Sequence, residues 1–309
     1  MSDIAPSVRE AIEALASDRT HGAARLAREA AAVMARAARE SDAGTPPELL
    51  STLREVARAV AAAQPRMAAV GNAVGAVLVA AEEASAAADA RSGDVGPVRR
   101  AAVAQARRIT AGWDQTARRI ARHAQTVVPK GPVLTHSHSA TVIAVLERLA
   151  KQGSPIVVTE SNPLGEGRTA ARLLAGRGLP VRLIADAQAG LFVSQMAAVL
   201  VGADTVFADG SVVNKVGTLA LALLARQRRV PFFVATESLK VAPGRWEETG
   251  ETLPLDASPG EPPAVYFDVT PPRLITALIT EDGVFGPSAG GGLAPLARRA
   301  RRWQRALWA

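Results

Sequence analysis

The residues with the clearest capacity for chemistry lie in loops that directly follow short apolar segments between residues 133 and 240. Among them, Gly202-Ala203-Asp204 places a carboxylate in an apolar setting beside a strand-like segment. Burial raises the pKa of such a carboxyl group, which suits acid–base work near neutral pH. A carboxylate that only caps a turn gives the same pattern, so both interpretations of Asp204 stay open at this point.

A second group of residues has the composition of an anion cradle. Asp209-Gly210, Asn214-Lys215 and Gly217-Thr218 follow one another closely along the chain. Glycines allow close backbone approach, a helix N-terminus offers amide hydrogens, and lysine adds a positive charge. An ordinary glycine-rich turn is the alternative. Lysine is rare in this arginine-rich chain, yet Lys215 and Lys240 both stand in loops after strands, which favours the cradle.

The first loop carries His136, Ser137, His138 and Ser139. A His-x-His pair can ligate a metal, but the chain has only four histidines and no cysteine, so we expect no metal site. A serine beside a histidine can also act as a nucleophile, but the glycine elbow of the serine hydrolases is missing. We expect Ser137, His138 and Ser139 to donate hydrogen bonds to a phosphate at a helix start.

Two glutamates, Glu160 and Glu237, stand at the ends of apolar strands. Their carboxylates could bind sugar hydroxyls, and pairing with a neighbouring arginine or lysine is the alternative. The framework behind all these loops is an alternation of apolar strands with helices, which indicates a parallel sheet in a doubly wound domain. Ligands of such folds bind beyond the carboxyl ends of the strands. The strands are predicted at residues 133–135, 156–159, 181–184, 205–207 and 232–234, with a last strand over 274–280.

The N-terminal part, residues 1–127, is rich in alanine and shows only helical patterns. Its final helix is predicted to run without a break from about Val98 to Gln125. Residues 128–309 are predicted to form the second, α/β domain. The whole is therefore an α/β protein in which an N-terminal helical domain precedes a parallel-sheet domain.

Composition limits the class of protein. With no cysteine among 309 residues, disulfides, thiolate metal sites and thiol catalysis are excluded. No apolar run approaches the roughly 18 residues of a membrane span, and the N-terminus does not resemble a signal peptide. We expect a cytoplasmic protein that does not associate with membranes.

The net charge of +7 raises the question of nucleic acid. Most of the arginines are spread along alanine-rich helices, which is typical of solvated faces. We therefore expect no nucleic-acid partner. RNA binding through the basic C-terminal run Arg298–Arg302 remains a weaker alternative, and it predicts an affinity that falls steeply with salt.

Six motifs occur in an order that resembles one protein family. They are Thr135-His136-Ser137-x-Ser139, Thr159-Glu160-Ser161-x-Pro163-x-x-Glu166-Gly167, Gly202-Ala203-Asp204, Gly210 with Asn214-Lys215-x-Gly217-Thr218, Glu237-Ser238-x-Lys240, and Asp268-x-Thr270-Pro271. Together they resemble the translation initiation factor 2B α/β/δ subunits. That family includes ribose-1,5-bisphosphate isomerase and methylthioribose-1-phosphate isomerase. The resemblance is dense over about residues 125–290 and looser in the helical part.

The resemblance implies a Rossmann-like second domain of the phosphosugar isomerase and CoA-transferase type, and a homodimer or larger homo-oligomer. In the isomerases of the family, a cysteine on the first loop and the aspartate of the Gly-Ala-Asp motif form the catalytic pair, and the Asn-Lys pair contacts substrate. Asp204, Asn214 and Lys215 match this pattern. Ser137 stands at the cysteine position, and Asn162 and Gln64 stand where arginines are expected.

These departures change the expected chemistry. A thiol titrates near about 8.5, whereas a serine hydroxyl is a far weaker acid, and lost arginines remove bidentate phosphate contacts. We expect a phosphosugar-binding protein without a cofactor, isomerase-like toward ribose-1,5-bisphosphate or a related 1-phosphate sugar, with Asp204 and Ser137 as catalytic residues. The alternative is a non-catalytic regulatory subunit that senses a sugar phosphate or a nucleotide. The expected substrate-binding residues are His136, His138, Ser139, Glu160, Asn162, Gly210, Asn214, Lys215, Glu237 and Lys240.

Overall fold

The computed structural model describes residues 4–18, 22–65, 67–87, 93–245, 265–286 and 292–308. Backbone contacts divide the chain into two compact units. The first unit comprises Met1–Thr116, Leu239–Pro243 and Pro295–Ala309, and the second comprises Ala117–Ser238 and Gly244–Ala294. None of the helices among the described residues combines the length and the hydropathy that a membrane crossing requires.

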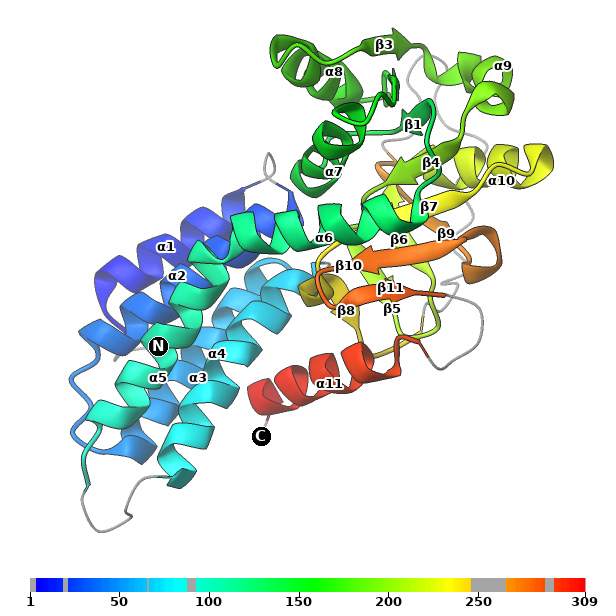
Figure 1. Cartoon of the computed structure of the whole chain (residues 1–309). Helices are drawn as coiled ribbons and strands as arrows, with labels where there is room; N and C mark the ends of the chain where they lie inside the picture. Colours follow the sequence, from blue (N-terminus) through cyan, green and yellow to red (C-terminus); the bar gives the residue numbers. More distant parts are fainter. Residues whose placement is uncertain are drawn as a thin grey trace, which may run out of the picture. The chain divides into compact units, whose positions relative to one another are not determined.

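The first unit is a helical bundle (Figure 1). Its helices bury small side chains at helical spacing: in α2, Leu26, Ala30, Val33 and Met34 all lie in the core. Alanine allows helix axes to approach closely, and Gly75 in α4 is the extreme case, since a Cβ there would lie 2.4 Å from the carbonyl oxygen of Trp303. The helices are α1 (Pro6–Ser17), α2 (Ala23–Glu40), α3 (Pro46–Ala63), α4 (Ala68–Ala87), α5 (Gly96–Ala111) and α11 (Ala294–Trp308), and the short strand β8 (Val241–Ala242) also belongs to this unit.

The prediction of one continuous helix from about Val98 to Gln125 is wrong. The structure has two helices here, α5 and α6 (Trp113–Val127), which are separated at Gly112. The amide of Gly112 still donates to the carbonyl oxygen of Arg108 at 3.0 Å, and a Cβ on Gly112 would lie 2.4 Å from that oxygen. The absence of a side chain at this position therefore permits the tight end of α5.

The second unit contains a seven-stranded sheet in the order β11-β10-β7-β4-β1-β2-β3. Every neighbouring pair is parallel except β10 and β11, which pair antiparallel at one edge. The prediction of a doubly wound parallel sheet is therefore confirmed. The strands are β1 (Val133–Thr135), β2 (Ile156–Thr159), β3 (Val181–Ile184), β4 (Ala198–Val201), β7 (Phe232–Ala235), β10 (Ala277–Thr280) and β11 (Gly283–Phe285).

One predicted strand was placed in the wrong sheet. The fourth parallel strand is β4, whose four residues are all buried, and the segment Thr205–Phe207 forms β5 in a smaller antiparallel sheet with β6 (Val212–Lys215) and β9 (Phe267–Thr270). The last parallel strand also begins later than residue 274, because Pro272–Leu274 forms a 3-10 turn before β10. The antiparallel pairing matters for the site, since β6 ends in Asn214 and Lys215.

Helices cover both faces of the large sheet (Figure 1). Alternate strand residues, such as Val133, Ile156 and Leu200, share one core with the helices α6, α7 (Ala140–Ala150) and α8 (Glu166–Gly176). On the other face, α10 (Thr218–Arg228) packs against β4 and β7. Short helical turns lie between the strands: η1 (Asp186–Gln188), α9 (Ala189–Phe192) and η2 (Val193–Gln195) follow β3, and η3 (Ser238–Lys240) and η4 (Pro272–Leu274) follow β7 and β9.

Candidate functional site

The candidate site lies where the strand order of the large sheet reverses. From β1 the chain winds outward to β2 and β3, and from the neighbouring β4 it winds the opposite way to β7 and β10. Crevices at such reversal points hold the ligands of doubly wound folds. The loop His136–Ser139 follows β1, and Gly202-Ala203-Asp204 follows β4. A Cβ on Gly202 would lie 3.0 Å from both Cβ and Oγ of Ser139, so the two predicted loops are direct neighbours.

The first loop is shaped by its own hydroxyl groups. Ser139 is the N-cap of α7, and its Oγ accepts from the amide of Val142 at 3.4 Å. Ser137 has a positive φ of 68°, and its amide donates to Oγ of Ser161 at 2.7 Å. The side chain of His138 is exposed. Of the predicted phosphate donors of this loop, Ser139 caps α7, Ser137 is half-buried and His138 is exposed.

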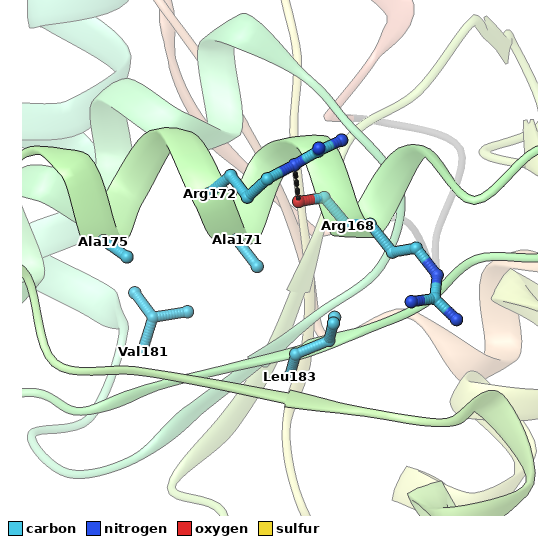
Figure 2. Close-up of a pocket in the computed structure, with 6 residues that line it drawn as sticks. All are labelled: Arg168, Ala171, Arg172, Ala175, Val181 and Leu183. Carbon is cyan, nitrogen blue, oxygen red and sulfur yellow. Dashed lines mark hydrogen bonds between the residues drawn. The ribbon is translucent and has the colours of Figure 1, made fainter.

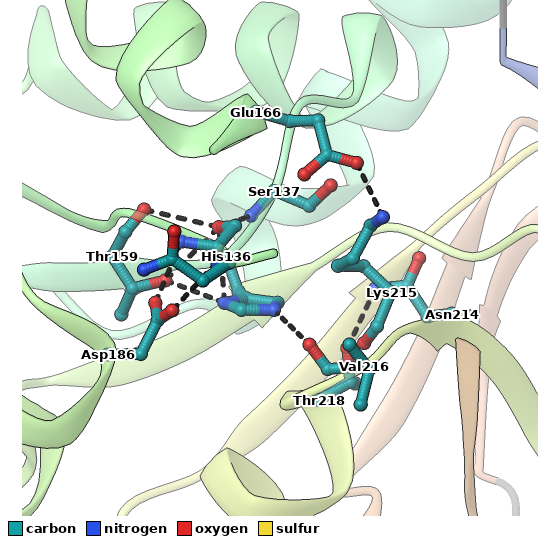
Figure 3. A network of polar contacts seen from close by, with 11 residues as sticks. His136, Ser137, Thr159, Glu166, Asp186, Asn214, Lys215, Val216 and Thr218 are labelled. Atoms are coloured by element: carbon teal, nitrogen blue, oxygen red, sulfur yellow. Dashed lines mark hydrogen bonds and ion pairs between the residues drawn. The ribbon is translucent and has the colours of Figure 1, made fainter. Parts of the chain in front are cut away.

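His136 is buried and has partners at both ring nitrogens (Figure 3). Nε2 lies 2.8 Å from the carbonyl oxygen of Val216, which can only accept, so this nitrogen carries the proton. Nδ1 lies 2.6 Å from Oγ1 of Thr159 and accepts from that hydroxyl. Burial lowers the pKa of His136, against a smaller opposite effect of its hydrogen bond to Val216. The neutral ring thus connects the ends of β1, β2 and β6.

The second loop, after β2, is held by a carboxylate from elsewhere in the chain. Oδ1 of Asp186 accepts from the amide of Ser161 at 2.7 Å, and Oδ2 accepts from the amide of Asn162 at 2.8 Å. The Asn162 side chain is exposed and donates to Glu160 at 3.3 Å. Glu160 also pairs with Arg168 of α8. Glu160 and Asn162, both predicted to bind substrate, therefore contact each other at the mouth of this loop.

Asn214 and Lys215 end β6 beside the start of α10. Nδ2 of Asn214 donates to Oγ1 of Thr218 at 3.0 Å, and that hydroxyl donates to the carbonyl oxygen of Lys215 at 2.6 Å. The Lys215 side chain is only 7% exposed, and its Nζ lies 2.5 Å from Oε1 of Glu166 (Figure 3). The ring centroids of Tyr266 and Phe267 lie 5.4 and 5.7 Å from the same Nζ.

The turn between β6 and α10 passes very close to His136. Gly217 has a φ of 104°, and a Cβ on it would lie 2.9 Å from Cε1 of His136. Only glycine adopts this conformation readily and leaves the space for the ring. The backbone conformation and the closeness of His136 therefore explain why a glycine stands at position 217 of the predicted motif.

The amides at the start of α10 already have an acceptor. Oδ2 of Asp268, on β9, accepts from Gly217 at 2.7 Å and from Leu219 at 3.0 Å. Burial raises the pKa of Asp268 to about 6, and these two backbone hydrogen bonds offset part of that rise. Sequence reasoning included Asp268 in a motif but did not place it in the site. An aspartate three residues before a proline gives no sign of a helix start 50 residues earlier.

The remaining predicted residues each have contacts of their own. Gly210, with a φ of 89°, turns the chain between β5 and β6. Asp204 is half-buried, and its amide donates to the carbonyl oxygen of Val213 at 2.9 Å. Glu237 is buried and accepts from the hydroxyl of Thr141 in α7. Lys240 is buried too, but it belongs to the Leu239–Pro243 segment of the first unit.

A separate hollow of about 390 Å³ lies between α8 and the edge strand β3 (Figure 2). It is lined by Arg168, Ala171, Arg172, Ala175, Val181 and Leu183. None of the predicted site residues lines it, and Arg172 turns back to donate to the carbonyl oxygen of Arg168 at 3.3 Å. Within the described ranges, no three His, Asp or Glu side chains are placed to hold a metal ion together.

Comparison with known proteins connects this geometry to one family. The model of the initiation factor 2 subunit family matches residues 19–257. The ribose 1,5-bisphosphate isomerase of Haloferax volcanii is 34% identical over 304 residues, which covers 92% of this chain and 90% of that protein. Among solved structures, the translation initiation factor eIF-2B of Pyrococcus horikoshii OT3 is 28% identical with a TM-score of 0.72, covering 92% of this chain and 98% of that one. The 5-methylthioribose 1-phosphate isomerase of the same organism is 26% identical with a TM-score of 0.70, covering 96% and 87%.

Proposed function

The chain belongs to the initiation factor 2 subunit family, and from this premise we propose that it binds a sugar phosphate beyond the carboxyl ends of β1 and β4 and acts on it as an aldose–ketose isomerase. The observation that carries the proposal is the meeting of two loops at the reversal point of the sheet. A Cβ on Gly202 would lie 3.0 Å from Ser139, which brings the Asp204 segment against the first loop. A ligand at this place contacts a helix N-terminus and a carboxyl group together.

In this proposal Asp204 is the acid and base of the reaction. In the isomerisation the bond between C1 and the ring oxygen breaks, and the hydrogen on C2 moves to C1 with its bonding electrons. O2 loses its proton as C2 becomes a carbonyl, and the ring oxygen gains a proton. A carboxyl group at Asp204 gives a proton to the departing ring oxygen and takes one from O2. Ser137 is too weak an acid to share this role as a cysteine would, so it positions the substrate through hydrogen bonds.

The phosphate and hydroxyl groups of the substrate are assigned to the surrounding polar side chains. Lys215 supplies positive charge, and the hydroxyl of Ser139 with the N-terminus of α7 supplies hydrogen bonds. Asn214, Glu160 and Glu237 are assigned to hydroxyls. His136 acts indirectly, because its ring nitrogens bond to Thr159 and Val216. The further contacts in this proposal are made by His138, Asn162 and the backbone at Gly210.

A second candidate function is a non-catalytic sensor of a sugar phosphate or nucleotide. Two observations favour it: the chain has no cysteine, and the eIF-2B of P. horikoshii covers nearly the same length of chain at a similar fold. A sensor of this kind binds the ligand but does not convert it to a product. The two functions therefore differ in turnover and agree in binding.

The experiment that separates them incubates the purified protein with ribose 1,5-bisphosphate and, separately, with methylthioribose 1-phosphate, and follows ketose formation by NMR. The same ligands are tested for thermal stabilisation, which mass action requires when only the folded state binds. Stabilisation with ketose product supports the isomerase, and stabilisation alone supports the sensor. The absence of both stabilisation and ketose product would refute sugar-phosphate binding for these two ligands.

The role of Asp204 is tested with Asp204→Asn, which keeps the shape of the side chain and removes its acid–base function. Turnover is expected to fall by at least about 100-fold, the usual contribution of a general acid or base, while ligand-induced stabilisation persists. Asp42→Asn is the matched control, because Asp42 is exposed in the loop between α2 and α3 and should leave both readouts unchanged. Full turnover in Asp204→Asn would remove Asp204 from the mechanism.

We also propose that the protein is a homodimer or a larger homo-oligomer. Light scattering on the purified protein tests this directly, since a dimer has twice the chain mass of 32.0 kDa. A mass equal to one chain at micromolar concentration would contradict it.

A further inference from the structure

Three groups of hydrogen-bond donors surround the candidate site, and each is already paired with a carboxylate of the chain itself. Asp186 holds the amides of Ser161 and Asn162, and Asp268 holds those of Gly217 and Leu219. Glu166 holds the ammonium of Lys215. The first two pairings fix backbone turns. The third pairing joins two long side chains, and Lys215 is the lysine of the predicted anion cradle. This pairing therefore affects how a ligand binds.

The position of Glu166 is fixed by its backbone. It is the first residue of α8, between Gly165, which adopts a left-handed conformation with a φ of 70°, and Gly167. A Cβ on Gly167 would lie 1.8 Å from the carbonyl oxygen of Thr159, so the start of α8 packs directly on the end of β2. From there the Glu166 side chain reaches Lys215 across the site (Figure 3).

The environment of Lys215 leaves little room for a second anion. Its side chain is 7% exposed, and the rings of Tyr266 and Phe267 lie near its Nζ in addition to the Glu166 carboxylate. A phosphate that contacts Nζ therefore comes close to Glu166. Like charges in a partly buried site repel strongly because little water screens them. Glu166 and a phosphate consequently compete for the same ammonium.

The second oxygen of Glu166 has a different character. Oε2 is buried and has no hydrogen-bond partner among the described residues. A carboxylate oxygen accepts hydrogen bonds, and a sugar hydroxyl can donate one to it. Inorganic phosphate, by contrast, brings mainly negative charge to the same place. The same carboxylate therefore disfavours a bare anion and can accept a hydroxyl from a sugar.

We propose that Glu166 is a specificity-determining residue, which makes the site reject inorganic phosphate and select a phosphate that carries a sugar. The inference rests on the proposed binding of a sugar phosphate beside Lys215. Glu166 acts on both parts of the ligand: its charge opposes the phosphate at Lys215, and its free oxygen accepts from the sugar.

The test compares the wild-type protein with Glu166→Gln, which removes the charge and keeps the size of the side chain. Dissociation constants for inorganic phosphate and for ribose 1,5-bisphosphate are measured by calorimetry. Inorganic phosphate is expected to bind at least about tenfold more tightly to Glu166→Gln, which equals about 1.4 kcal/mol, and the preference for the sugar bisphosphate is expected to shrink. Glu29→Gln is the matched control, since Glu29 pairs with Arg25 at 2.9 Å on the exposed face of α2 and should change neither constant.

The outcomes separate this inference from the proposed function. Inorganic phosphate binding that is unchanged or weaker in Glu166→Gln overturns the role of Glu166, while wild-type binding of the bisphosphate still supports the proposed function. If Glu166→Gln binds inorganic phosphate more tightly than the wild type and neither protein binds the bisphosphate, the role of Glu166 is supported and the proposed sugar-phosphate ligand is refuted. No binding of either ligand to either protein overturns both. If Glu166→Gln does not fold, Glu166→Ala is measured in the same way, with the same expected direction.

Discussion

Replacing Asp268 by asparagine should change how the stability of the protein depends on pH. The carboxylate of Asp268 accepts from two amides at the start of α10, and burial raises its pKa from 3.8 to about 6. Asparagine keeps an oxygen that can accept one or both of these hydrogen bonds. It has no proton to gain or lose in this range, so the contribution of the ionisation disappears.

The sign and the size of the effect follow from proton linkage. Well below pH 3.8 the carboxyl group is protonated in both the folded and the unfolded chain, and its stabilising contribution is fully present. As the pH rises toward 6, the unfolded chain ionises first, so the free energy of unfolding falls until the folded form ionises as well. At 1.36 kcal/mol per pH unit, the whole step amounts to about 3 kcal/mol. Partial exposure of Asp268 makes this an upper limit.

The assay is urea unfolding of the wild type and Asp268→Asn at intervals from pH 4 to pH 7.5. Other carboxyl groups, such as the half-buried Glu281 with its raised pKa, titrate equally in both proteins and cancel in the difference. The free energy of unfolding of the wild type, minus that of the variant, should fall by up to about 2.4 kcal/mol between pH 4 and pH 7, because the unfolded carboxyl group is already more than half ionised at pH 4. A difference that stays constant, or that rises with pH, would refute the reasoning about the buried carboxylate.

Two further substitutions test the turns that shape the site. Gly217→Ala places a Cβ 2.9 Å from His136 at a φ of 104°, so we expect a loss of about 1–3 kcal/mol in urea unfolding. Gly244→Ala, where nothing lies within 4 Å, is its control, and equal losses would contradict the prediction. Asp186→Ala removes two charge-assisted hydrogen bonds to the second loop, so we expect a loss of about 1.5–3 kcal/mol and faster hydrogen exchange at the amides of Ser161 and Asn162. Unchanged exchange at these two amides would show that the loop does not depend on Asp186.

Much of the fold was predictable because its signals are local. Helical spacing in α2, capping by Ser139 and short buried strands such as β2 are visible within a few residues. The error in the last helix of the N-terminal part and the error in the sheet assignment have the same origin. Gly112 inside a helical pattern costs only about 1 kcal/mol, so the pattern alone does not decide whether the helix breaks there. Thr205–Phe207 has the composition of a buried strand, and only its long-range pairing with β6 assigns it to the other sheet.

The site was predictable as a set of loops but not as a set of contacts. The order of motifs identified the loops after β1, β2 and β4, and the parallel sheet explains why such loops share one edge. The carboxylates that hold these loops were not recognised. Asp186 lies 25 residues from Ser161, and Asp268 lies 51 residues from Gly217. No periodicity along the chain relates such partners, so only the folded structure reveals them.

The way Asp186 holds the second loop bears on which side chains the loop can tolerate. Its two oxygens bind main-chain amides, which every residue type except proline provides. The exposed side chain at position 162 is therefore not needed to keep the loop in shape. A charged side chain in place of Asn162 therefore changes the charge of the loop without removing the two backbone hydrogen bonds that Asp186 accepts.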